Sequence, residues 1–273
     1  MYRSDYHLHT LISSDSPATL AQQAQAALKA GLNELCVTDH WNLLDQQGNS
    51  LSHTRDWSDS IAQIQQAREL FDDQLEIRLG IEVGNGEIDP AGICEGFAQA
   101  GDALDFVIGS LHNMSLGSGG LGIYSAAHQC RQIEEGIAML DDYMNTLTAL
   151  AATDTFDIIG HVIYPLRYLP QQWQLTLSPY EEQLRSLFDR LVRSGRGIEL
   201  NTSQGNTIAE WTDVLKLYRD CGGEILTVGS DAHRPEWIGA GFSDAYALLK
   251  SLGFRWVCTY RSRKPVFHAL ENL

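Results

Sequence analysis

The chain has 273 residues, of which 44% are hydrophobic and 20% charged, a composition that supports a folded core and excludes disordered and collagen-like chains. Its 35 Asp and Glu outnumber 19 Lys and Arg, and the formal net charge of −16 argues against partners such as nucleic acid or an anionic membrane, which need positive charge. No run of about 18 apolar residues, signal-peptide core or Cys-x-x-Cys pair occurs, so we expect a cytoplasmic protein with reduced thiols.

Short apolar runs alternate with segments of helical spacing from the beginning of the chain to its end. The predicted strands are residues 2–9, 34–39, 76–82, 106–112, 156–161, 197–201 and 224–231, with 255–260 as a further candidate. The predicted helices are residues 20–28 before Gly31, 61–70, 180–192 after Ser178-Pro179, and 211–218. This β-α alternation predicts an α/β fold with a parallel sheet closed or nearly closed into a barrel, in one domain over residues 1–273.

One segment departs from this alternation. Residues 115–122 read Ser-Leu-Gly-Ser-Gly-Gly-Leu-Gly, and so many glycines predict a mobile loop rather than a helix or strand. The segment lacks the Lys-Ser/Thr pair of a phosphate-binding P-loop. We expect this loop, together with Asn113, to close over a bound substrate.

Imidazoles and carboxylates fall at the carboxyl ends of the predicted strands. They are His7, His9, Asp39, His40, Glu82, His112, His161, Asp231 and His233. In a β/α barrel these strand ends meet at one rim, and residues two apart in a strand share a face. One histidine at a strand end is usually structural, but this many at one rim predict a metal site. Nitrogen and oxygen donors without a thiolate suit Zn, Mn or Fe, and their number predicts more than one ion. Asp39 is expected to orient a neighbouring imidazole rather than to bind metal.

The order of these motifs resembles a known family. The motifs are His7-Leu-His9, Asp39-His40, Gly80-Ile-Glu82, Ser110-Leu-His112, Gly160-His161 and Gly229-Ser-Asp-Ala-His233. From Tyr6 to about Pro235 the chain resembles the PHP (polymerase and histidinol phosphatase) superfamily, and residues 261–265 are similar to stand-alone histidinol-phosphatases. The resemblance implies a distorted (β/α)7 barrel, related to the TIM barrel, that holds three divalent metal ions.

The resemblance also implies which residues bind each ion. The first ion would take His7, His9, Glu82 and Asp231; the second would share Glu82 and add His112 and His161; the third would take Asp15, His40 and His233. The family's activity implies a small phosphorylated substrate, with L-histidinol phosphate as the first candidate. We expect attack on phosphorus by a hydroxide held between two ions. Asp231, or a water near His233, is expected to donate the proton to the leaving group.

Substrate contacts are predicted from the chemistry of phosphate. An arginine is expected near the rim, with Arg167 as the first choice and Arg234 as the second. Related histidinol-phosphatases often carry an Arg soon after an Asn-Thr-Ser-Gly segment, but here residues 201–207 read Asn-Thr-Ser-Gln-Gly-Asn-Thr and the next arginine is Arg219. A phosphoesterase acting on another small ester or a nucleotide therefore stays an alternative.

Two other function classes are weighed against this one. A non-catalytic PHP module is disfavoured because none of the main ligand set is missing, and an amidohydrolase is disfavoured because no Lys lies at a strand end. With an acidic surface and no evident apolar stripe, we expect a monomer.

Overall fold

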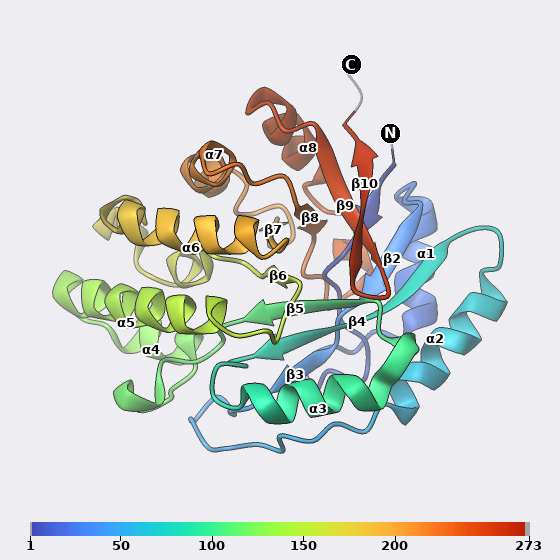
Figure 1. The fold of residues 1–273 in the computed structure, drawn as a ribbon, viewed down its shortest axis with the longest axis horizontal. Coiled ribbons are helices and arrows are strands. Elements are labelled where there is room, and N and C mark those ends of the chain that lie inside the picture. The colour runs from blue at the N-terminus through green and yellow to red at the C-terminus, as the bar shows by residue number, and fades with distance from the viewer. Residues whose placement is uncertain (1, 271–273) are drawn as a thin grey trace.

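A computed structural model describes residues 2–270, and its centre is a parallel sheet that curls into a nearly closed barrel (Figure 1). The barrel strands, in spatial order, are β1 (Ser4–Asp5), β2 (Glu34–Val37), β4 (Glu76–Gly84), β5 (Phe106–Ser110), β6 (Ile158–Ile159), β7 (Gly197–Asn201) and β8 (Leu226–Gly229), and β3 (His40–Asn42) pairs with β4. The seam between β8 and β1 is joined by the amide of Tyr6, which donates to Val228 O at 3.0 Å, and by a parallel bridge from Leu8 to Ala232. The predicted α/β fold, with a parallel sheet nearly closed into a barrel, is confirmed.

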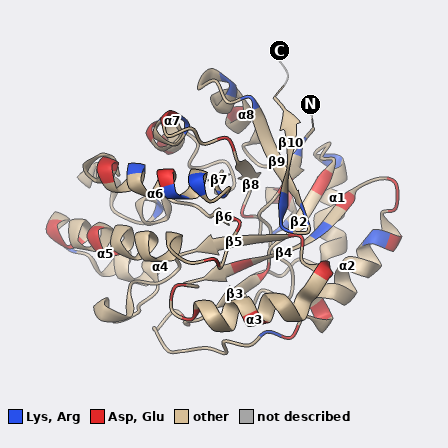
Figure 2. Cartoon of the chain, viewed as in Figure 1, with Lys and Arg blue, Asp and Glu red and all other residues tan. Residues whose placement is uncertain are grey.

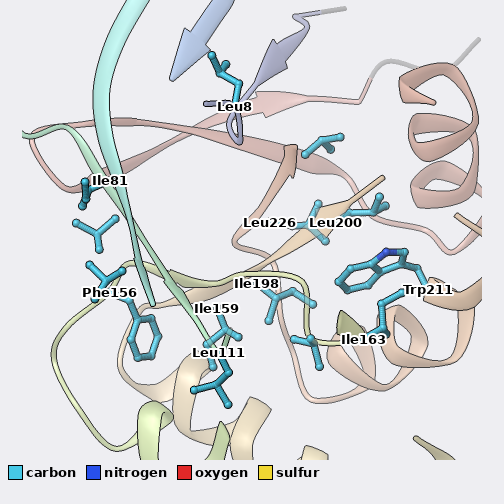
Figure 3. Close-up of a cluster of buried hydrophobic side chains, with 14 of the residues drawn as sticks. Leu8, Ile81, Leu111, Phe156, Ile159, Ile163, Ile198, Leu200, Trp211 and Leu226 are labelled. Carbon is cyan, nitrogen blue, oxygen red and sulfur yellow. The ribbon is translucent and has the colours of Figure 1, made fainter. Parts of the chain in front are cut away.

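Helices lie around the outside of the sheet (Figure 1). They are α1 (Leu20–Lys29), α2 (Ser58–Leu70), α3 (Pro90–Ala100), α4 (Ile123–Gln129), α5 (Ile133–Ala151), α6 (Glu181–Arg193), α7 (Thr212–Asp220) and α8 (Phe242–Ser251). Alternate strand residues such as Ile198 and Leu200 pack outward in a buried apolar layer that includes Trp211 (Figure 3). Their sequence neighbours therefore point into the barrel, where the rim residues gather.

The last predicted strand lies outside the barrel. Residues 255–260 were a further strand candidate, and a strand is present there as β9 (Trp256–Arg261), but it pairs antiparallel with β10 (Lys264–Ala269) in a separate hairpin. Ser262 and Arg263 form its two-residue turn with φ of 47° and 65°. The turn is held at the barrel, because Arg263 Nε binds Asp157 Oδ2 at 2.5 Å.

The hairpin closes the amino-terminal end of the barrel. Cys258 and Tyr260 of β9 join a small buried cluster with inward side chains of the barrel strands, among them Tyr6 and Phe106. Arg261 binds the fully buried carboxylate of Glu34 through both terminal nitrogens, at 2.5 and 2.9 Å. Residues 261–265, which resembled histidinol-phosphatases in sequence, therefore belong to the end of the barrel opposite the rim.

Charged side chains are distributed over the outer helices. Figure 2 shows acidic residues on several helices, with basic ones interspersed on α6, where Glu181 and Glu182 begin the helix and Arg190 and Arg193 end it. This order follows the helix dipole. Within residues 2–270, no helix has the length and apolar character that crossing a membrane requires.

Candidate metal centre

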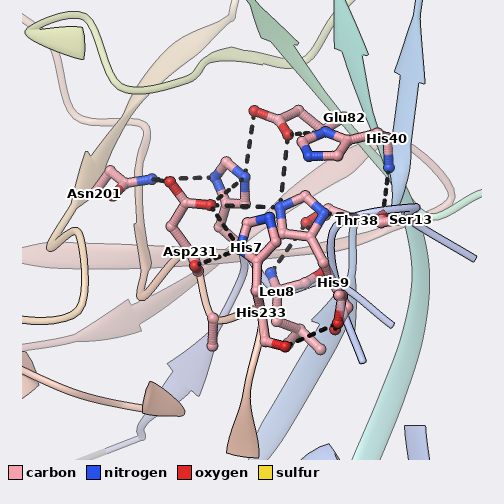
Figure 4. A network of polar contacts seen from close by, with 12 residues as sticks. His7, Leu8, His9, Ser13, Thr38, His40, Glu82, Asn201, Asp231 and His233 are labelled. Carbon is pink, nitrogen blue, oxygen red and sulfur yellow. Dashed lines mark hydrogen bonds and ion pairs between the residues drawn. The ribbon is translucent and has the colours of Figure 1, made fainter. Parts of the chain in front are cut away.

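Glu82, near the end of β4, contacts several imidazoles of the rim cluster, and Figure 4 shows its carboxylate beside His40. Its Oε1 is 2.9 Å from His161 Nε2 and 3.1 Å from His112 Nε2. Its Oε2 is 2.8 Å from His40 Nδ1, and His7 Nε2 lies 3.3 Å from Oε1. One carboxylate thus contacts imidazoles delivered by four different parts of the barrel, as expected for a group shared between ions.

The innermost imidazoles have ring nitrogens that point into this space without a hydrogen-bond partner. His7 and His9 are fully buried, and within the described chain neither Nε2 has a hydrogen bond, nor does Oε2 of Glu82. Both Nε2 atoms approach Asp231 Oδ1, at 3.6 and 3.4 Å. Buried polar atoms normally find partners. A set of unpartnered nitrogen and carboxylate donors aimed at one point therefore fits a divalent cation.

The remaining predicted ligands lie on the outer side of the same cluster. Asp15 has a half-exposed carboxylate, whose Oδ2 is 3.3 Å from His40 Nε2 and 3.4 Å from His233 Nε2. The His9 ring is 4.1 and 4.2 Å, centroid to centroid, from those of His40 and His233. All nine predicted ligand positions are therefore in one cluster, with Asp15 within reach of the outer pair.

Donor groups within 4.8 Å of one another fall into four overlapping sets. They are His7-His9-Glu82, His7-His161-Asp231, His40-Glu82-His112 and His9-His40-His233. The overlap differs from the division implied by the family resemblance, because His7, His9 and His40 each belong to two sets. The structure brings all of these residues together at one rim.

Second nitrogens of several rings are held by hydrogen bonds from outside the cluster. His112 Nδ1 is 2.8 Å from Asn42 Oδ1, and His9 Nδ1 is 3.2 Å from Ser13 Oγ. Ser13 Oγ in turn donates to Asp39 Oδ1 at 2.8 Å. Asp39 therefore acts on His9 through a hydroxyl rather than directly. Such partners fix which ring nitrogen keeps its proton and which is free to bind metal.

The electrostatics of the cluster favour cation binding. Burial lowers the pKa of His9, and the neighbouring imidazoles of His40 and His233 lower it further, to about 3. Burial opposes ionisation of Glu82, but the surrounding imidazoles, His7 foremost, hold its pKa well below the usual range. His9 and Glu82 are therefore in the protonation states that bind metal at neutral pH. Burial opposes protonation of His7 and His40, but facing carboxylates outweigh it, raising the pKa of His7 and bringing that of His40 to about 10, so a bound ion would displace protons from these two rings.

Of the two predicted phosphate arginines, Arg167 reaches the cluster. It follows β6 in a short 3-10 turn (Tyr164–Arg167), and its guanidinium is 3.1 Å from Asp231 Oδ2 and 2.7 Å from Asn201 Oδ1. Its buried Nε has no hydrogen-bond partner among the residues described. Arg234 is exposed and lies over the Trp237 ring at 5.7 Å. Of the two, Arg167 has the geometry to meet a ligand at the cluster.

Asn113 and the glycine-rich segment are arranged differently from the prediction. The Asn113 amide nitrogen is buried and donates to the backbone oxygens of Asp45 and Gly120, at 2.7 and 2.8 Å. Ser115 binds Asp142 on α5 through its backbone nitrogen and its hydroxyl, at 2.8 and 2.6 Å. The segment also contains a short 3-10 turn (Leu116–Ser118). The segment is therefore a loop, as predicted, with one three-residue 3-10 turn, and the contacts of Ser115 attach its beginning to α5. The closure of this loop and Asn113 over a substrate stays a prediction.

Sequence reasoning missed Glu199, a fully buried carboxylate within the barrel. Its strand, β7, ends without a histidine, so the search for imidazoles at strand ends passed it over. The available signal was an acidic residue in the middle of an otherwise apolar strand, since buried carboxylates require partners.

A nearly closed parallel barrel with imidazoles and carboxylates on its carboxyl rim defines a metal-binding barrel protein. Among known families, the PHP domain model matches residues 5–203, and the chain belongs to this family.

Relatives cover almost the whole chain. A probable histidinol-phosphatase of Deinococcus radiodurans is 29% identical over 95% of this chain and 97% of its own length. A histidinol-phosphatase of Lactococcus lactis is 24% identical, over 97% of this chain and 96% of its own. The crystal structure of histidinol phosphate phosphatase from Lactococcus lactis, complexed with zinc, L-histidinol and phosphate, superposes with a TM-score of 0.81 at 23% identity, covering 97% of this chain and 98% of the other. At this identity the superposition shows a shared fold.

Proposed function

We propose that the protein is a metal-dependent phosphomonoesterase that hydrolyses L-histidinol phosphate to L-histidinol and phosphate, a step of histidine biosynthesis. The observation that carries the proposal is the position of Arg167 beside the cluster of candidate metal ligands. Its buried guanidinium is 3.1 Å from Asp231, and its Nε–H has no hydrogen-bond partner among the described residues. Positive charge from both an arginine and metal ions is the arrangement that a phosphate dianion requires. The names of the full-length relatives supply the particular ester.

The proposed cofactors are three divalent ions, with Zn, Mn and Fe as the candidates. Their ligands would be His7, His9, Asp15, His40, Glu82, His112, His161, Asp231 and His233. When bound, such ions supply a water of lowered pKa and positive charge that stabilises the phosphoryl oxygens. Zinc is supported by its presence in the Lactococcus lactis structure, and the mixed set of nitrogen and oxygen donors is also compatible with Mn or Fe.

This chain's own residues would position the ester. Arg167 can give its unused N–H groups to two phosphoryl oxygens, because its fork is held on the other side by Asp231 and Asn201. Tyr164 lies against the guanidinium, 5.2 Å from the ring centroid, and limits its movement. The phosphate would then lie between the arginine and the imidazoles.

The structure favours one source for the proton of the leaving group. Burial raises the pKa of Asp231, but His7, His9 and Arg167 outweigh it and hold the pKa well below the usual range. An ionised carboxylate accepts protons, so Asp231 is better suited to binding than to donation. We therefore place proton delivery on the side of His233, whose side chain is 20% exposed and open to solvent.

A second candidate function has one specific observation in its favour. The family-typical arginine after the Asn-Thr-Ser segment is absent, and Asn201 instead binds Arg167. A changed set of phosphate contacts is compatible with another small phosphate ester or a nucleotide.

The deciding experiment measures phosphate release from L-histidinol phosphate and from p-nitrophenyl phosphate, with and without a chelator. Chelator-sensitive turnover with a strong preference for L-histidinol phosphate supports the first function. Weak turnover of both esters supports the second, and no turnover at any metal loading refutes both.

Three further expectations belong to this proposal. The parallel sheet runs from β1 to β8 and the carboxyl-terminal hairpin packs on its base, which supports one domain over residues 1–273. The five cysteines are free thiols, which supports a reducing, cytoplasmic location. We expect a monomer because the acidic sequence shows no evident apolar stripe, and light scattering of the purified protein would test this.

A further inference from the structure

We propose that Glu199 is a positioning residue whose carboxylate binds His7 and His161, which are proposed ligands of two different ions. Through Asn201, Glu199 also connects these ligands to Arg167. The inference rests on the proposed metal-dependent function and assigns it a residue outside the ligand set. Glu199 Oε1 is 2.7 Å from His7 Nδ1. Its Oε2 accepts the backbone N–H of His161 at 3.0 Å and the Asn201 amide at 3.1 Å.

The interior of the barrel is shaped around this carboxylate. Glu199 is fully buried on the inward face of β7. A Cβ on Gly229 would lie 2.3 Å from Glu199 Oε1 and 2.4 Å from His7 Cβ, so only glycine leaves room for the pair to meet. The side chains of Glu199 and His7 thus meet in the space that a side chain at position 229 would fill.

A carboxylate here does what an amide cannot do. All three groups on Glu199 are donors, and an ionised carboxylate accepts from each of them. His7 must therefore carry its proton on Nδ1, which leaves the Nε2 lone pair aimed at Glu82 and Asp231, at 3.3 and 3.6 Å. In Glu199→Gln one oxygen becomes an NH2 group that faces a donor, and the orientation of His7 is lost.

The network continues to the arginine. Asn201 gives its amide hydrogen to Glu199 and accepts from Arg167 Nη2 at 2.7 Å, while Arg167 Nη1 returns to Asp231 at 3.1 Å. The chain of contacts from His7 through Glu199, Asn201 and Arg167 to Asp231 forms a closed ring around one side of the cluster (part of it in Figure 4). Metal ligands and phosphate arginine therefore share one rigid support.

The test measures zinc affinity of the full-length protein by competition with a chelator. For Glu199→Gln we expect a Kd for zinc that is about 10- to 100-fold weaker, the usual cost of removing a carboxylate behind a ligating histidine. The matched control is Glu34→Gln, which alters an equally buried glutamate at the other end of the barrel and should lower thermal stability while leaving zinc affinity within about threefold. A folded Glu199→Gln protein with wild-type zinc affinity overturns the inference. Wild-type protein that binds none of zinc, manganese and iron overturns the proposed function instead.

Two measurements do not depend on that variant folding. In the zinc-loaded wild type, the Nδ1 proton of His7 should give a downfield NMR resonance protected from exchange with water, and a resonance that exchanges freely would contradict the contact with Glu199. Asn201→Ala should raise KM for the phosphate ester about tenfold, the loss of roughly one hydrogen bond to a charged group, with zinc affinity retained. An unchanged KM would refute the coupling to Arg167.

Discussion

Arg167 offers the most direct test of how the site would hold a phosphate ester. Its guanidinium has five N–H donors, of which the structure assigns one to Asp231 and one to Asn201. Three donors remain, including the buried Nε–H that has no partner within the part of the chain described. Two of them suffice for a bidentate contact with phosphate.

The size of the expected effect follows from those two bonds. A hydrogen bond to a charged group contributes about 1.5–3 kcal/mol, so loss of two, partly replaced by water, costs about 3–4 kcal/mol. That corresponds to a decrease of about 100- to 1000-fold in kcat/KM, mostly through KM, since the phosphate charge is present before the reaction. Arg167→Lys keeps the charge but loses the fork, so it should fall between Arg167→Ala and wild type.

The assay is steady-state hydrolysis of L-histidinol phosphate, with metal content measured on the same samples. Arg167→Ala should keep its metal, because His7 and His9 remain beside Asp231. The control is Arg185→Ala, which removes a half-exposed arginine of α6 and should behave as wild type. An Arg167→Ala enzyme with wild-type KM, or one in which Arg234→Ala has the larger effect, would refute the reasoning.

Three further predictions concern metal, pH and stability. Glu82→Ala should lose both bound metal on dialysis and activity, since this carboxylate contacts most of the cluster; retained metal in elemental analysis would contradict its shared role. Burial raises the pKa of Glu87 from 4.5 to about 7. The folded state therefore disfavours the ionised carboxylate, and this residue lowers the free energy of unfolding as the pH rises from about 4.5 to 7. Glu87→Gln should then be more stable than wild type by about 2–3 kcal/mol at pH 8 and equal to it below about pH 4, and equal urea midpoints at both pH values would refute this. Arg261→Ala should cost about 3 kcal/mol in urea unfolding, because it removes the cation that binds both oxygens of the buried Glu34 and leaves only the longer 3.6 Å contact with Arg78 Nε; zinc affinity should be preserved, and an unchanged midpoint would refute the prediction.

The barrel was predictable because its strands are buried on both faces and read as short apolar runs. Residues 197–201 match β7 residue for residue. Other strands are shorter than predicted, since the rim residues bend out of the sheet: β1 is assigned at Ser4–Asp5, yet His7 and His9 still lie beside the cluster. The position of a polar residue after an apolar run therefore predicted the site residues better than the length of the run predicted the strand bounds.

What the sequence did not indicate depends on contacts between distant segments. The hairpin of residues 256–269 is attached to the barrel by Arg261 meeting Glu34 and Arg263 meeting Asp157, pairs more than 100 residues apart. The role of Glu199 depends in the same way on His7, 192 residues away. Periodicity and capping signals are local, so they carry no information about such pairs.

The hairpin also has a consequence for synthesis. Ribosomes complete β9 and β10 after every strand of the barrel, so a nascent barrel has an open base, with Tyr6 and Phe106 lacking the cover of Tyr260. Uncovered aromatic side chains promote association of incomplete chains. A premature stop before Trp256 would thus yield a chain that retains every rim histidine yet is prone to aggregate. The residues that bind metal and the residues that keep the chain soluble therefore lie in different parts of the sequence.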